Sequence, residues 1–315
     1  GASEAEAAAF ADSNIDSFAA KPANGWTDWK DELFKTGGHQ NYQVSVSGGG
    51  QNTQFYSSLS YTKQDGIIQN QGLERFTGNA NLTHTFKRLT VQVTSQFSKM
   101  IQKKTNEGTS YDGAVANYAF FQSPSSTPYN EDGSLNNGCG MFGVNPLYEF
   151  QHSSDRATII KAFNTVKATY NIWDNLNLSE KISYDYMTNT NDVLWDRYSN
   201  NGGPGGVMQR IISKNEQLNT QTQLTYNKAF GEHNIDALLG FETEDNKYAY
   251  NYLSGQDYPG DLYEFTNAGS TSADSNIQSY RLTSFLGRVN YDFGGKYYLS
   301  ASYRTDGSSR LARDN

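Results

Sequence analysis

The most constraining feature of this sequence is a pair of alternating segments near its end, SFLGRVNYDF and KYYLSASYRT, separated by Gly294 and Gly295. In each segment the apolar residues recur at every second position, and polar residues fill the positions between them. An apolar period of two on both sides of a Gly-Gly pair is the pattern of a β-hairpin. One face of this hairpin is apolar and rich in aromatic residues, so it packs on a protein core or contacts lipid.

The same alternation recurs along the chain and predicts about ten strands. The expected connections alternate between tight turns and longer loops, and the long loops lie near 103–156, 190–207 and 250–278. A Greek-key sandwich has no reason to sort its loops in this way, whereas an up-and-down transmembrane barrel places all tight turns on one side. Aromatic residues also gather beside the tight turns, as in an interfacial girdle: Phe86, Trp173, Phe230, Phe293 and Tyr297. These aromatics could equally be ordinary packing at hairpin ends.

We therefore predict an all-β fold, an antiparallel up-and-down transmembrane β-barrel over residues 41–315, preceded at 1–40 by a loop segment with a short helix. The alternation in 176–186 places the apolar set with Leu176 outward and the polar set with Lys181 inward. Glu180 falls on the outward face. We expect the register of that strand to shift or bulge at this residue.

Composition excludes several classes of function. A net charge of -8 and a pI of about 5.1 give no basic stripe for nucleic acid. No stretch is apolar enough for a transmembrane helix. The four histidines have no metal-ligand spacing, and Cys139 is a single loop thiol without a visible partner. The start of the chain lacks a signal peptide, so we expect a mature form or an internal piece of a longer protein.

We find no enzyme motif and expect no catalysis and no cofactor. The glycine-rich 202–206 segment lacks the Lys-Ser/Thr of a phosphate loop and favours a flexible loop. Glu242, Glu244 and Asp245 form an acidic cluster that we interpret as a solvated rim at a strand end. A glycosidase pair using Glu242 or Asp245, and a calcium site in the loops, remain alternatives.

The expected loops carry aromatic residues interleaved with amides and carboxylates. Such rings stack on the apolar faces of sugars, and amides bind hydroxyl groups. The same residues could instead pack the loops or contact a partner subunit. The candidates for contact with a substrate or a lid protein are Tyr111, Phe120, Phe121, Tyr129, Trp195, Tyr198, Tyr258 and Tyr263.

The segment YRTDGSSRL, from Tyr303 to Leu311, resembles the RDGSSRF element of the SusC/RagA family of TonB-dependent outer-membrane transporters of Bacteroidetes. Other segments resemble the family in the same order: WTDWKDELFKTG from Trp26, the hairpin from Asn41 to Ile68, NPLYEF from Asn145, HNIDALLGFE from His233 and the closing hairpin from Phe285. The residues that carry the motifs are Trp29, Asp306, Gly307, Ser308, Ser309 and Arg310. Thr305 and Leu311 replace the usual Arg and Phe.

This resemblance implies part of a barrel of about 22 strands, with its plug absent from this sequence and its long loops extracellular. It implies a location in the outer membrane of a Gram-negative bacterium, in contact with outer-membrane lipids. The implied function is import of an oligosaccharide, or sometimes a peptide, beneath a SusD-like lipoprotein lid. The TonB–ExbB–ExbD complex would act through the plug. The alternative from another class is a soluble or surface β-rich glycan-binding module.

Overall fold

The computed structural model describes residues 3–10, 25–105, 120–138 and 144–311. Two residues singled out in the sequence, Tyr111 and Cys139, lie outside these ranges. Residues 4–10 are helical. No helix in the described ranges is both long enough and apolar enough to cross a membrane.

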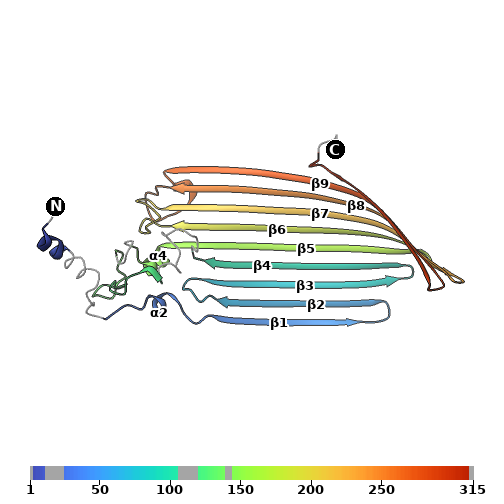
Figure 1. Ribbon diagram of the computed structural model, residues 1–315, viewed down its shortest axis with the longest axis horizontal. Coiled ribbons are helices and arrows are strands. Elements are labelled where there is room, and N and C mark those ends of the chain that lie inside the picture. The colour runs from blue at the N-terminus through green and yellow to red at the C-terminus, as the bar shows by residue number, and fades with distance from the viewer. Residues whose placement is uncertain (1–2, 11–24, 106–119, 139–143, 312–315) are drawn as a thin grey trace.

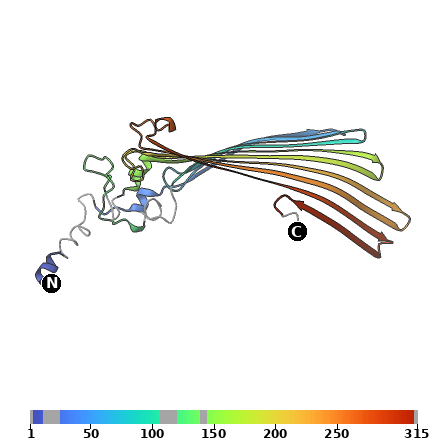
Figure 2. The ribbon, with the colours of Figure 1, turned by 90° about the horizontal axis from the view of Figure 1, so that it is seen from above.

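The ten strands form a single antiparallel sheet in chain order (Figure 1), as the alternating pattern predicts. The sheet curves strongly along its length (Figure 2). The strands are β1 (Gly38–Gly49), β2 (Thr53–Asp65), β3 (Gly72–Phe86), β4 (Leu89–Lys104), β5 (Ser153–Trp173), β6 (Leu176–Trp195), β7 (Val207–Phe230), β8 (His233–Gln256), β9 (Ser270–Phe293) and β10 (Tyr297–Ser308). The short helices are α2 (Trp29–Leu33), α4 (Pro146–His152) and the 3-10 helix η1 (Phe265–Asn267).

The connections sort by length to the two ends of the sheet. All five tight turns lie at one end, and the longer connections, with α2 and α4, lie at the other end (Figure 1). At the tight end Lys87, Gly231, Gly294 and Gly295 all adopt positive φ, which is typical of the short turns of β-hairpins. We refer to the opposite end as the loop end.

The strands continue further into the predicted loop regions than the apolar alternation does. β8 runs to Gln256 and β9 begins at Ser270, so much of the segment 250–278 is paired backbone. Trp195 is likewise the last residue of β6. The paired segment of β9 reads STSADSNIQ. Ladder hydrogen bonds need no apolar side chains, so these strand ends carry no signal in a hydropathy pattern.

One face of the sheet is apolar across every strand, because the register keeps the apolar positions in line. Leu82, Val93, Val166 and Ile182, for example, lie directly opposite one another on β3 to β6. These side chains are exposed or half-buried, and no second layer of the described residues covers them. The girdle aromatics lie on this face at the tight end, where Phe86, Trp173 and Tyr297 are strongly exposed.

The prediction of a register shift or bulge at Glu180 is wrong. Glu180 lies on the apolar face in regular register with Ala168 of β5 and Thr222 of β7, and the irregularity in β5 falls between Asn171 and Trp173 instead. The Thr222 hydroxyl donates a hydrogen bond to the Glu180 carboxylate at 2.5 Å. A side-chain partner therefore accommodates this carboxylate, and the strand keeps its register.

The compact apolar core of the described residues lies at the loop end rather than under the sheet. Trp29 and Leu33 of α2 pack with Ile68 from the β2–β3 connection and Leu147 of α4. The indole of Trp29 also donates a hydrogen bond to the Ser123 carbonyl at 3.0 Å. This core fixes the two helices against the ends of β2 and β3.

Candidate functional site

The candidate site is the loop end, where residues far apart in sequence meet around α4. The motif NPLYEF forms this helix. Asn145 is its N-cap and is fully buried, and its Oδ1 accepts a hydrogen bond from the Leu147 amide at 3.0 Å. Its Nδ2 donates to the carbonyls of Pro128 at 2.8 Å and Asn136 at 2.9 Å. Asn145 therefore caps the helix and holds the preceding loop with one side chain.

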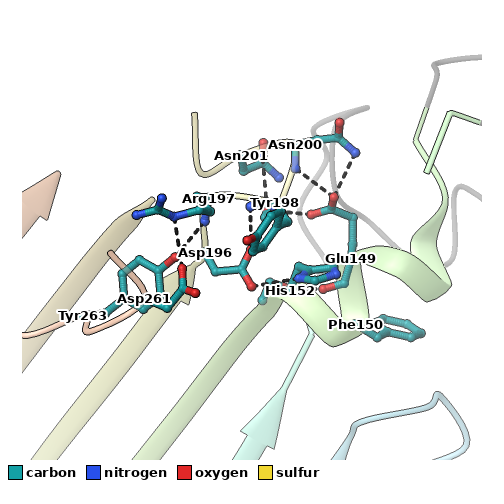
Figure 3. A network of polar contacts seen from close by, with 12 residues as sticks. Glu149, Phe150, His152, Asp196, Arg197, Tyr198, Asn200, Asn201, Asp261 and Tyr263 are labelled. Atoms are coloured by element: carbon teal, nitrogen blue, oxygen red, sulfur yellow. Dashed lines mark hydrogen bonds and ion pairs between the residues drawn. The ribbon is translucent and has the colours of Figure 1, made fainter. Parts of the chain in front are cut away.

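The other side of α4 carries a polar network with the β6–β7 connection (Figure 3). Glu149 accepts hydrogen bonds from the Ser199 hydroxyl at 2.7 Å and from the Asn200 backbone amide at 2.8 Å. His152 Nδ1 lies 2.8 Å from Asp196 Oδ2. The other carboxylate oxygen of Asp196 accepts from the amides of Tyr198 and Ser199. These bonds attach the loop after β6 to the helix before β5.

Arg197 extends the network to the β8–β9 connection (Figure 3). Its backbone amide donates to the Tyr263 hydroxyl at 2.9 Å, its guanidinium donates to the Tyr258 carbonyl at 2.9 Å, and its Nε lies 3.1 Å from Asp261 Oδ1. The rings of Tyr258 and Tyr263 pack edge to face, 5.1 Å apart. Three connections are thus bound together into one unit.

The glycine-rich segment 202–206 is part of this packed unit. A Cβ on Gly205 would lie 2.5 Å from the Cα of Asp257, and Gly206 has a φ of +83° beside the Tyr263 ring. The glycine content alone had favoured a flexible loop. Its glycines instead permit close approach of two loop backbones.

Burial raises the pKa of two tyrosines in this unit. The pKa of Tyr148 rises because its phenol is removed from water, and the charges of Asp196 and Glu149 raise it further. The pKa of Tyr258 rises through burial first and the charge of Glu264 second. The hydroxyl of Tyr258 is buried without a hydrogen-bond partner among the described residues. Both phenols are therefore neutral at physiological pH.

The aromatic candidates separate into two groups. Phe120, Phe121, Tyr129 and Tyr198 are exposed at the loop end. Tyr258 is buried and packs against the half-buried Tyr263, in agreement with the alternative that these two residues pack the loops, and Trp195 is half-buried at the end of β6. The Tyr129 hydroxyl donates to Glu32 at 3.0 Å, and the pKa of Tyr129 is raised by burial and by this carboxylate. Contact with a substrate or lid remains a prediction for the exposed group.

The closing motif ends β10 and folds back over β9. Ser309 exchanges hydrogen bonds with the backbone of Arg281 at 2.9 and 3.0 Å. The guanidinium of Arg310 lies over the Tyr280 ring, 4.2 Å from its centroid. Asp306 accepts hydrogen bonds from the Ser284 hydroxyl and from Arg304. Gly307 and Ser308 pair in register with Thr283 and Leu282. These motif residues thus have structural contacts within the sheet.

The interpretation of the acidic cluster of β8 as a solvated rim at a strand end is wrong. Glu242, Glu244 and Asp245 lie within the strand, and Asp245 is on the face opposite to the other two. Each has a partner: Glu242 pairs with Arg304 at 3.0 Å, Glu244 accepts from the Tyr280 hydroxyl at 2.7 Å, and Asp245 pairs with Arg281. Glu242 and Asp245 therefore do not form the carboxylate pair of a glycosidase.

The inward face, opposite to the apolar one, is polar along whole rows of the sheet. One in-register row crosses β2 to β10 and consists of Gln54, Thr83, Gln92, Lys167, Lys181, Gln221, Glu242, Ser284 and Asp306. A cavity of about 200 Å³ lies over its end, lined by Lys181, Glu242, Arg304 and their neighbours. Within the described part of the chain, no group of three or more His, Cys, Asp or Glu residues could hold a metal ion.

Sequence reasoning missed the residues that join the loops: Asn145, Glu149, His152, Asp196 and Arg197. NPLYEF was recognised as a motif, but Ser199 and Asn200, the partners of its Glu149, lie about 50 residues further along the chain. The local signal was the sequence Asn-Pro followed by apolar residues, which is an N-cap with Pro at the first helical turn.

The chain is similar in sequence to curated TonB-dependent receptors. It is 28% identical to TonB-dependent receptor P3 of Formosa agariphila over 98% of this chain and 32% of the relative. It is 25% identical to TonB-dependent receptor SusC of Bacteroides thetaiotaomicron over 92% of this chain and 31% of the relative. The chain thus spans about a third of the length of these relatives. No family model matches it.

The fold is similar to that of a solved transporter. The structure of the RagAB peptide transporter superposes with a TM-score of 0.82 at 20% identity, covering 93% of this chain and 34% of the other. The RagAB peptide importer in its open-open state gives a TM-score of 0.81 at 21% identity, covering 96% of this chain and 36% of the other. The predicted fold, a portion of an up-and-down transmembrane barrel, is confirmed. The relatives are named as receptors and transporters, in agreement with the prediction of a non-enzyme.

Proposed function

We propose that the chain is part of a SusC/RagA-like TonB-dependent receptor of the Gram-negative outer membrane, and that the whole protein imports a nutrient. The cargo we propose is an oligosaccharide, with a peptide as the alternative. A SusD-like lipoprotein would cover the loop end, and the TonB–ExbB–ExbD complex would supply force through the plug. The name of the RagAB peptide transporter supports the peptide alternative.

One observation carries the proposal: from the tight end to about the middle of the longer strands, the two faces of the sheet have opposite chemistry. The outward face is uncovered and apolar, which suits contact with acyl chains. The inward face carries polar rows with paired charges such as Arg304 and Glu242. A wall that is apolar outside and polar inside is what a water-filled passage through a membrane requires.

Exposed aromatic side chains support our proposal that cargo and lid bind at the loop end. Phe120, Phe121, Tyr129 and Tyr198 are exposed there on loops that the network around α4 holds in place. Exposed rings on a fixed support can stack on sugar or peptide groups with little loss of side-chain entropy. We therefore propose that the loop end is extracellular and faces the lid protein.

Import is tested by growth and uptake. Cells that lack the receptor are supplied with candidate oligosaccharides or peptides as the sole carbon source, and uptake is compared with complemented cells. The expected result is loss of uptake of one class of compound, restored by the intact receptor and not by a receptor without its TonB-contacting segment. Uptake that is unchanged in the deletion strain for every class would refute the proposal. The lid is tested by purifying the receptor and determining whether a lipoprotein copurifies with it.

The glycan-binding module is the alternative from another class. It requires the apolar face to pack on a second sheet, and the described residues supply one sheet with that face uncovered. Extraction separates the two hypotheses: a receptor is released from washed membranes by detergent, and a module is released without it.

A further inference from the structure

Three basic side chains form an unpaired group on the outward face near the loop end. Lys103 of β4 and Arg156 of β5 lie directly opposite each other, and Lys99 lies on the same face of β4. All three are exposed. None has a hydrogen bond or ion pair with another of the described residues. Like charges placed directly opposite on neighbouring strands repel each other, so an external anion that contacts both side chains would stabilise this arrangement.

The other basic residues of the outward face differ from this group. Arg210 pairs with Asp192 at 2.5 Å and Lys214 with Glu216 at 2.9 Å, and Arg281 pairs with Asp245. Lys63 lies opposite Glu74, and Lys247 lies opposite Glu216. Asp192 lies opposite Arg156 in register, but its carboxylate is engaged by Arg210. Lys228 of β7 also has no hydrogen bond or ion pair among the described residues, but it lies opposite Ile235 near the tight end. Lys103 and Arg156 are, among the described residues, the one pair of basic side chains on this face that lie directly opposite each other.

The position of the group relative to the apolar band identifies the kind of anion. An apolar band about 25 Å tall corresponds to about ten residues of a strand tilted by about 40°. Counted from Leu89 at the tight end of β4, the band ends near Lys99, and Lys103 and Arg156 lie beyond it. Phe76 is directly opposite Lys99, and Phe97 is on the same face of β4. The cations thus lie at headgroup height, directly above aromatic side chains that contact acyl chains.

We propose that Lys103 and Arg156, with Lys99 beside them, bind the phosphate of a membrane lipid in the outer leaflet. The guanidinium of Arg156 can donate two parallel hydrogen bonds to phosphate oxygens, and the ammonium groups add charge. The acyl chains of the same lipid lie over Phe76 and Phe97. This inference rests on the proposed function for its orientation, because it needs the loop end to be extracellular.

The test measures lipid binding by the whole receptor purified in detergent, using native mass spectrometry. The probes are phosphorylated lipid A and the same lipid after enzymatic removal of its phosphates. The double variant K103Q/R156Q should bind phosphorylated lipid A at least about tenfold more weakly than the wild type, because charge-assisted hydrogen bonds are lost. Binding of the dephosphorylated lipid should be weak and equal for both proteins.

The control is R281Q/K247Q, which removes two charges from the same face and should change binding by less than about twofold. Equal binding of phosphorylated lipid A by K103Q/R156Q and the wild type would overturn the inference. Full competition by millimolar inorganic phosphate would overturn it too, since the site would then be one for free phosphate. If the double variant does not fold, the single variants K103Q and R156Q are compared, and wild-type binding in both overturns the inference.

Failure of this inference is distinguishable from failure of the proposed function. Detergent-dependent extraction and nutrient uptake are measured on the same strains. A receptor that inserts and imports but binds lipid A independently of its phosphates refutes only the lipid site. A wild-type protein that is recovered without detergent refutes the membrane orientation on which the inference rests.

Discussion

Replacement of Asn145 by alanine should locally open the loop end. The side chain caps α4 and holds two loop carbonyls, with all three hydrogen bonds between 2.8 and 3.0 Å. Loss of the cap costs about 1 kcal/mol, and loss of two buried hydrogen bonds costs about 1 kcal/mol each. The sum, about 3 kcal/mol, raises the local opening constant by about two orders of magnitude.

The assay is amide hydrogen exchange of the whole receptor, read at Leu147 and Glu149. Local exchange is informative because the sheet can stay folded while the loops open. The variant Asn145→Ser keeps an N-cap oxygen and loses the two carbonyl contacts, so it should lose about 2 kcal/mol of protection. Asn200→Ala, which removes one exposed side-chain contact to Glu149, should lose less than about 1 kcal/mol. Protection in Asn145→Ala within about fivefold of the wild type would refute the reasoning.

Three further substitutions test other parts of the structure. Trp29→Ala should destabilise the loop-end core by about 3 to 5 kcal/mol, seen as faster proteolysis between 25 and 152 while the β6–β7 and β8–β9 connections resist cleavage. Tyr258→Phe should stabilise the β8–β9 connection by about 1 kcal/mol, because it removes a buried hydroxyl without a partner; unchanged or faster exchange there would contradict this. Glu180→Leu should raise the unfolding midpoint in lipid, whereas Thr222→Val, which leaves Glu180 without its partner, should lower it.

The sheet was predictable from the sequence because two local signals coincide in it. Strand periodicity and turn residues are both read within about ten residues, and each hairpin pairs neighbours in the chain. The turn at Gly294 and Gly295 and the register of Tyr291 with Leu299 follow from those signals alone. The ends of β8 and β9 were not predictable, because their ladder continues through polar residues where neither face is apolar.

The candidate site was only partly predictable, because its contacts are long-range and polar. The sequence indicates that Tyr258 and Tyr263 are aromatic loop residues, and it cannot indicate that Arg197, about 60 residues earlier, binds both of them. Glu180 shows the same limit: its partner Thr222 is set by the pairing of β6 with β7. Such contacts can be identified only when the pairing of the strands is known.

The two sides of α4 explain why one short motif connects so much of the loop end. Leu147 lies in the core with Trp29, and Glu149 and His152 face the loop after β6. The helix ends directly before β5, and Asp196 directly follows β6. Because β5 and β6 are neighbours in the sheet, the contact of His152 with Asp196 links the loop-end termini of these two strands. Displacement of the exposed loop aromatics therefore has to deform a bonded support, which is the arrangement that a binding surface on loops requires.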